Sequence, residues 1–63
     1  MVILDVIFDD VEYETEKAYL LNIDGEKYWI PKSQVEDLDE ELKIITLPEW
    51  LINEKGLDMY IAE

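Results

Sequence analysis

The chain has 63 residues, of which 17 are Asp or Glu and five are Lys, with no Arg and no His, so its formal net charge is −12. Such a charge repels nucleic acid and anionic membranes, which excludes direct binding to either from the functions that we expect. Because 49% of the residues are hydrophobic, with two Trp, four Tyr and one Phe among them, we predict one folded domain over residues 1–63. No Cys is present, so this domain has no disulfides.

The start of the chain reads Met-Val-Ile-Leu-Asp and has no basic segment, unlike a secretory signal peptide. No stretch approaches the roughly 20 apolar residues that a membrane span needs. We therefore expect a soluble, unsecreted protein of the cytoplasm that does not contact a membrane.

Two strands are predicted at the start of the chain. Residues 2–8 are apolar except for Asp5, which predicts a central strand that is buried on much of both faces. From residue 11 onwards, uncharged residues alternate strictly with glutamates, a pattern typical of a strand with one face in water. We expect the three glutamates to share that wet face: Glu12, Glu14 and Glu16.

A tight hairpin is predicted around Asp24 and Gly25, since this pair favours the positive φ angles of a two-residue turn. The resulting register pairs Ile23 with Glu26, Leu21 with Tyr28, Leu20 with Trp29 and Tyr19 with Ile30. The second strand of the hairpin ends at Pro31, which has no N–H to donate to a sheet.

Beyond the hairpin we expect a short irregular segment over residues 32–35, an acidic connector over residues 36–41 and a strand over residues 42–47. Pro48 then suits the first position of a short helix over residues 48–55, and Gly56 suits its end. In this helix Trp50 and Leu51 are predicted to be buried against Leu47.

Both Trp29 and Trp50 are predicted to belong to the core, because a domain this small has few other large side chains. The apolar residues 59–61 are expected either to add an edge strand or to reach a second subunit. Together these elements predict an α+β fold: a small, curved, barrel-like antiparallel sheet of about four strands with one short C-terminal helix. Exposed strand edges make a homodimer plausible.

Several short motifs resemble a family of short, uncharacterised proteins that are frequent in phage and prophage genomes. They read WIPKSQ over residues 29–34, LPEWL over residues 47–51 and KGL over residues 55–57. The similarity extends over residues 15–57, about two-thirds of the chain. The resemblance implies a phage context and structural roles for Trp29, Pro31 and Trp50, but it implies no catalytic or binding residue.

The composition does not favour an enzyme. Acid–base or nucleophilic catalysis needs a base beside a nucleophile, whereas the chain has no His, no Cys and a single serine, Ser33. The neighbouring Lys32 is expected to point to the other side of an extended chain. An acidic cluster of Asp37, Asp39, Glu40 and Glu41 could hold a hard cation, but it lacks the glycine and the spaced glutamate of a calcium loop. We expect a solvated loop there, with no metal and no cofactor.

The acidic surface points to protein binding. Three glutamates spaced two residues apart on a strand would lie about 6.7 Å from one another, a spacing comparable to that of nucleic-acid phosphates. We therefore expect a nucleic-acid mimic that docks on a basic, nucleic-acid-handling protein, as a phage-type inhibitor or modulator such as an anti-CRISPR or other anti-defence factor.

Two alternatives remain open: an accessory interaction module of phage replication, recombination or virion assembly, which binds through apolar and Tyr surfaces, and a structural homodimer. If the protein is viral, its place is the cytoplasm of the host cell. The residues that we predict to bind the partner are Glu12, Glu14, Glu16, Asp37, Asp39, Glu40, Glu41, Tyr13 and Tyr60.

Overall fold

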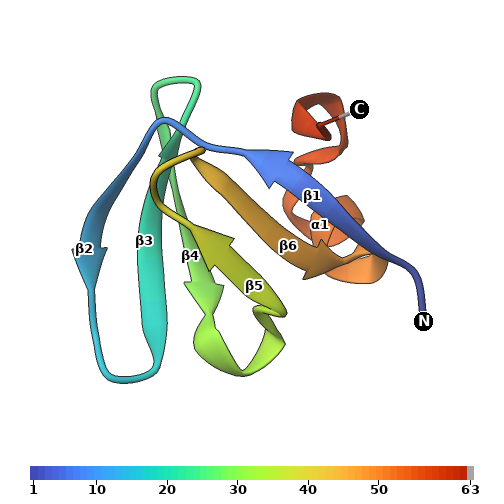
Figure 1. Ribbon diagram of the computed structural model, residues 1–63, viewed down its shortest axis with the longest axis horizontal. Coiled ribbons are helices and arrows are strands. Elements are labelled where there is room, and N and C mark those ends of the chain that lie inside the picture. The colour runs from blue at the N-terminus through green and yellow to red at the C-terminus, as the bar shows by residue number, and fades with distance from the viewer. Residues whose placement is uncertain (63) are drawn as a thin grey trace.

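The protein, described by a computed structural model over residues 1–62, has an α+β fold with two three-stranded antiparallel sheets and one short α-helix (Figure 1). One sheet has the order β1-β6-β5, formed by Ile3–Ile7, Ile44–Pro48 and Asp37–Asp39. The other has the order β2-β3-β4, formed by Asp10–Glu14, Ala18–Ile23 and Glu26–Pro31. The expected α+β class is confirmed. The expected single sheet of about four strands is wrong, because six strands form two separate sheets and neither closes into a barrel.

The hairpin of β3 and β4 has the register that the sequence predicts, from Ile23 opposite Glu26 to Tyr19 opposite Ile30. Its turn residues have positive φ angles, 53° at Asp24 and 83° at Gly25. The strand β4 ends at Pro31, as expected, and the 3-10 helix η1 (Lys32–Gln34) follows it. Local turn chemistry is thus sufficient to set this half of the second sheet.

The edge strand β2 contains one extra residue. Val11 pairs with Leu21 and Tyr13 pairs with Leu20, so Glu12 has no partner of its own in β3. An extra residue of this kind is a β-bulge, and it shifts the alternation of the residues that follow by one position. Tyr13 therefore points to the face that the simple alternation assigns to the glutamates.

In the first sheet β6, and not β1, is the central strand. Val6 pairs with Ile45 of β6 and, on its other side, forms a single bridge with Ile61. Only one face of β1 is buried, since Ile3 is 46% exposed and Ile7 is 50% exposed. The expectation of a central strand buried on both faces is therefore wrong. The expected acidic connector also differs, because its middle residues pair with β6 as the strand β5.

The helix α1 (Glu49–Lys55) begins after Pro48 and ends at Gly56, whose φ of 71° only glycine adopts freely. Its buried residues are Leu51 and Ile52, whereas Trp50 is 50% exposed. Consecutive helical residues are rotated by about 100° around the axis, so the face that buries Leu51 and Ile52 leaves Trp50 at its side. The prediction that Trp50 is buried is therefore wrong.

One core lies between the two sheets and the helix. It consists of aliphatic side chains and one phenylalanine: Val6, Phe8, Leu21, Ile23, Ile30, Ile45, Leu47, Leu51, Ile52 and Leu57. Neither tryptophan belongs to it, since Trp29 is 48% exposed on the outer side of β4. Aliphatic residues of five elements, β1, β3, β4, β6 and α1, together with Phe8 and Leu57, form the core without the indole rings, which corrects the expectation of a Trp-based core.

The C-terminal segment folds back along β1. It contains the 3-10 helix η2 (Asp58–Tyr60), after which Ile61 bridges to Val6 and the backbone N–H of Ala62 donates to the carbonyl of Asp5 at 2.8 Å. Of the edge strand expected over residues 59–61, the structure has only the single β-bridge at Ile61. Within residues 1–62, no helix is long and apolar enough to cross a membrane.

Candidate binding surfaces

The predicted row of three glutamates does not exist as one face. Residues that lie opposite one another in a sheet point to the same face. Glu14 of β2, Tyr19 of β3 and Ile30 of β4 are paired in this way, and Ile30 is buried, so Glu14 is on the inner side of its sheet. There its carboxylate forms an ion pair with Lys32. Glu16 follows the end of β2, in the loop to β3. The bulge is the physical reason for this correction, because it reverses the orientation of the residues after Glu12.

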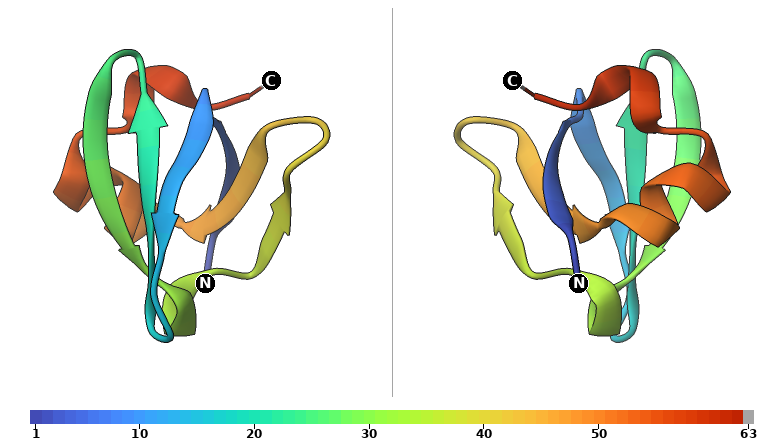
Figure 2. Two further views of the ribbon diagram at one scale, coloured as in Figure 1. Left: turned by 90° about the vertical axis from the view of Figure 1, so that its left-hand side faces the viewer. Right: turned by 90° about the vertical axis from the view of Figure 1, so that its right-hand side faces the viewer.

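The same bulge brings an aromatic row to the outer face of the second sheet. Tyr13 of β2, Leu20 of β3 and Trp29 of β4 lie directly opposite one another across the three strands. Tyr13 is 62% exposed and Trp29 is 48% exposed. The left view of Figure 2 looks onto this side of the molecule, and no other element covers the three strands there. We call Tyr13, Leu20 and Trp29 the aromatic row.

A polar row lies beside the aromatic row on the same face. Asp10, Asn22 and Lys27 are opposite one another in the register. Glu12 also reaches this row, since its Oε2 accepts a hydrogen bond of 3.1 Å from Nδ2 of Asn22. Asp10 forms an ion pair of 3.0 Å with Lys43. The outer face therefore combines exposed aromatic rings with carboxylates, of which Glu12 has no cationic partner within residues 1–62.

The acidic residues after η1 lie in the other sheet. Asp37 and Asp39 belong to β5, and Glu40 and Glu41 to the turn before β6. Oδ1 of Asp39 accepts hydrogen bonds from the backbone N–H groups of Glu41 (3.0 Å) and Leu42 (2.9 Å), so this carboxylate stabilises the turn. In the described part of the chain, no three acidic side chains come close enough to hold a metal ion.

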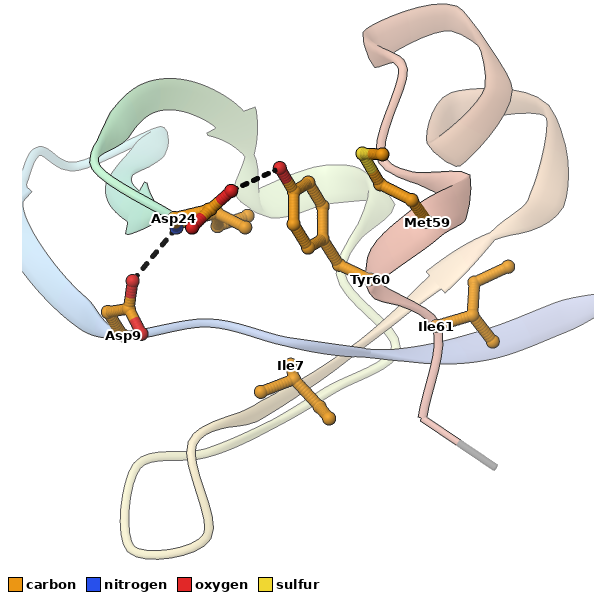
Figure 3. A pocket seen from close by; sticks show the side chains of 7 residues that line it. Ile7, Asp9, Asp24, Met59, Tyr60 and Ile61 are labelled. Carbon is orange, nitrogen blue, oxygen red and sulfur yellow. Dashed lines mark hydrogen bonds between the residues drawn. The ribbon is translucent and has the colours of Figure 1, made fainter.

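An open hollow of about 310 Å³ lies where three distant parts of the chain meet (Figure 3). The phenol of Tyr60 donates a hydrogen bond of 3.0 Å to Oδ2 of Asp24, and the N–H of Asp24 donates one of 2.8 Å to Oδ2 of Asp9. We call this cavity the tail pocket, because η2 and Ile61 form one of its walls. Its lining residues are Ile7, Asp9, Ile23, Asp24, Met59, Tyr60 and Ile61.

Two tyrosines near this pocket are held in their neutral form. The hydrogen bond to Asp24, with loss of hydration and the charge of Asp24, raises the pKa of Tyr60 above the ordinary value of 10.0. Loss of hydration, followed by the charge of Glu26, raises the pKa of Tyr28 in the same direction. An ordinary tyrosine is already neutral at pH 7, so the raised pKa extends to higher pH the range in which both phenols can donate a hydrogen bond.

The structure thus separates the predicted partner-binding residues. Glu12 and Tyr13 share the outer face, Tyr60 lies in the tail pocket, and the acidic residues of β5 and its turn lie in the first sheet. Sequence reasoning missed Trp29 as an exposed residue, Leu20 as its neighbour on the outer face, and Asp24 as a pocket residue. Part of the outer face was predictable from the sequence, because the expected hairpin register already placed Leu20 opposite Trp29 on one side of the strands.

Comparison of the chain with protein-family models, with curated proteins and with solved structures found no match. The functional inference therefore rests on these surfaces.

Proposed function

We propose that this protein is a non-enzymatic binding protein that docks the outer face of its β2-β3-β4 sheet on a basic protein. The observation that carries the proposal is the aromatic row, in which Tyr13 and Trp29 are exposed on either side of the half-buried Leu20 and next to the carboxylate of Glu12. Tyr and Trp are enriched among the residues that dominate the binding energy of protein interfaces. An exposed row of this kind is best explained as a contact surface.

Charge supports a basic partner. The chain carries a net charge of −12, and only two ion pairs, Lys32–Glu14 and Lys43–Asp10, are present within residues 1–62. Most carboxylates therefore remain without a cationic partner, and together they produce a negative electrostatic potential around the protein. This potential steers a basic protein toward the surface and accelerates association at low salt. The aromatic row then supplies short-range apolar contacts that salt does not screen.

Among basic proteins, those that handle nucleic acid are the class that we propose. Their binding sites are clusters of Lys and Arg that attract a dense negative charge. The support is the charge density of this small chain and not a phosphate-like spacing, because the bulge breaks the glutamate row. With its resemblance to short phage proteins, the chain fits a phage-type inhibitor or modulator, such as an anti-CRISPR or other anti-defence factor in the cytoplasm of a host cell.

An accessory interaction module of a phage replication, recombination or virion assembly is the second candidate. The aromatic row favours it as well, since apolar contacts do not require a basic partner. A structural homodimer has less support. Two copies, each with a net charge of −12, would repel one another. Residues 60 and 61 also make contacts within their own chain, Tyr60 with Asp24 and Ile61 with Val6.

The test compares two tryptophans of nearly equal exposure, Trp29 at 48% and Trp50 at 50%. Trp29→Thr removes the end of the aromatic row from a strand, and Trp50→Gln removes an indole from α1, outside the row. Tagged wild type and both variants are used to capture partners from a lysate at low and at high salt. The bound proteins are identified by mass spectrometry, and capture is repeated in the presence of competing nucleic acid.

The proposal predicts that basic proteins are captured at low salt and released at high salt, and that nucleic acid competes with their capture. Trp29→Thr is expected to weaken capture at least tenfold, the effect of a residue that contributes more than about 1.4 kcal/mol to binding, while Trp50→Gln binds as the wild type does. A salt-resistant, neutral partner lost with Trp29→Thr would instead identify an accessory module. Equal loss in both variants would contradict the assignment of the outer face.

A further inference from the structure

We propose that the tail pocket is a binding site for a lysine side chain. This inference rests on the proposed function, because the basic partner would supply that lysine. It adds a second point of contact, formed by η2, the β3–β4 turn and the end of β1, away from the aromatic row. The pocket is an open hollow of about 310 Å³, large enough for one long side chain.

The walls of the pocket are apolar. Ile7, Met59 and Ile61 line it from β1, η2 and the residue after η2, and Figure 3 shows their side chains spread around the Tyr60 ring, below it and on the side away from Asp24. Ile7 is 50% exposed and Met59 is 75% exposed, so this apolar surface is open to solvent. The hydrocarbon stem of a lysine covers such a surface while its charged end stays at the rim.

Two carboxylates mark the charged end of the pocket. Asp9 and Asp24 each use Oδ2 as an acceptor, from the N–H of Asp24 and from the hydroxyl of Tyr60 respectively. The other oxygen of each carboxylate accepts no hydrogen bond within residues 1–62, and no lysine lines the pocket. Each carboxylate therefore retains an oxygen for a cation, and Tyr60 fixes the position of one of them.

Ammonium suits this arrangement better than guanidinium. Lysine carries three donors that point in different directions, so it bonds to oxygens of two separate carboxylates. The guanidinium of arginine is a planar fork that matches the two oxygens of one carboxylate, and in Asp24 one of these already accepts from Tyr60. An anionic group is repelled by both aspartates, and an uncharged alkyl chain leaves them without a partner.

The experiment follows backbone amide shifts by NMR in the ¹⁵N-labelled protein. The probe is Nα-acetyl-lysine N-methylamide, and the control ligand is the norleucine analogue, which has an alkyl side chain without the ammonium group. The arginine analogue tests guanidinium. The protein variant is Asp24→Asn, which keeps an oxygen to accept from Tyr60 and tolerates the positive φ of 53° at this position. Its matched control is Asp37→Asn, an exposed aspartate of β5 that does not line the pocket.

We expect the lysine probe to give saturable shifts confined to the pocket, at residues 7, 23, 24, 60 and 61, with a Kd on the order of millimolar for so small a ligand. Norleucine and arginine analogues should bind several-fold more weakly. Asp24→Asn should weaken lysine binding about two- to fivefold, as the loss of one exposed charge partner does, while Asp37→Asn binds like the wild type. The spectra of both variants report directly whether they are folded.

Shifts that spread over all acidic residues without saturation would show a diffuse counterion effect and overturn the proposal. Equal binding of norleucine, tighter binding of arginine, or equal weakening in Asp24→Asn and Asp37→Asn would overturn it as well. Since no partner protein is used, this result is independent of the capture experiment. If the pocket fails while Trp29→Thr still abolishes capture, the proposed docking face stands without the lysine site.

Discussion

The hydroxyl of Tyr60 donates a hydrogen bond of 3.0 Å to Oδ2 of Asp24. It joins the C-terminal segment to the turn of the β3–β4 hairpin. The N–H of Asp24 extends the connection to Asp9, in the link between β1 and β2. Three segments that are distant in sequence are thereby held together at one end of the molecule.

Removing the hydroxyl in Tyr60→Phe is expected to lower the free energy of unfolding, because the hydrogen bond that joins the C-terminal segment to the hairpin turn is lost. Tyr13→Phe is the matched control, since Tyr13 is 62% exposed and its hydroxyl has no partner within residues 1–62. Urea unfolding of both variants measures the difference. An equal effect of the two substitutions would show that the Tyr60–Asp24 bond does not stabilise the fold.

Alkaline pH is expected to weaken the fold through the same residue. The pKa of Tyr60 is raised in the folded protein, above 10.0, by its hydrogen bond to Asp24. A raised pKa means that the folded state holds the proton more tightly than the unfolded state does. The stabilising contribution is therefore complete below about pH 10 and is lost as the pH rises through the folded pKa.

This loss of stability is measured by urea unfolding of the wild type and of Tyr60→Phe at several pH values between pH 8 and pH 11. The difference between the two proteins should be constant up to about pH 10 and then shrink. Tyr28, whose pKa is raised mainly by loss of hydration, adds a further decline that is common to both proteins. A difference that stays constant to pH 11 would contradict the role of Tyr60.

Ile52 is expected to matter more for stability than its larger neighbour Trp50. Ile52 is fully buried and Trp50 is 50% exposed. Ile52→Val removes one buried methyl group and should lower the free energy of unfolding by about 0.5–1.5 kcal/mol. Trp50→Phe at the half-exposed position should change it by less than about 0.5 kcal/mol. Chemical denaturation that ranks the two in the opposite order would contradict the position of α1.

Added salt is expected to stabilise the protein. The molecule measures 26 × 22 × 21 Å and carries a net charge of −12. At 10 mM salt the Debye length of about 30 Å spans all its carboxylates, whereas at 150 mM it is about 8 Å. Screening this repulsion should raise the free energy of unfolding by on the order of 1 kcal/mol, or the Tm by about 4–8 °C.

Thermal unfolding at the two salt concentrations measures the effect. Sodium chloride and potassium chloride should act alike, because screening does not depend on a specific cation. A fall in Tm with salt would show that the ion pairs Lys32–Glu14 and Lys43–Asp10 outweigh the repulsion.

Those parts of the fold that depend on local chemistry are predictable from the sequence. Asp24 and Gly25 determine the turn through their own φ angles, and the complete register of β3 and β4 follows from it. Gly56 ends the helix for the same reason. In each case neighbouring residues make the interaction, so distant parts of the chain do not alter it.

The bulge at Glu12 is not predictable from alternation. The sequence alternates without interruption there, and the extra residue exists only relative to the partner strand β3. A shift of one position reverses every side chain that follows. The bulge therefore places Tyr13 on the outer face of the sheet and Glu14 on its inner side, where the Glu14 side chain is still 54% exposed. The outer face thus presents an aromatic row in place of the predicted row of glutamates.

The tail pocket was missed for a different reason. Asp9, Asp24 and Tyr60 lie in a link, a turn and a 3-10 helix that only the tertiary fold brings together. Composition also misled the prediction of the core, because large aromatic residues were assigned to it. Nine aliphatic side chains and Phe8 fill the core instead, and both tryptophans are half-exposed.

The strand β1 pairs with partners that are made late in synthesis. β2, β3 and β4 pair only with their neighbours along the chain, so the strand pairing of this meander needs no residue beyond Pro31. Residues 3–7 precede the meander, yet their partners are β6 and Ile61. Long loops cost more entropy to close than short ones, so the meander is expected to form first. On a ribosome, residues 3–7 therefore stay unpaired until residues 44–48 have been made.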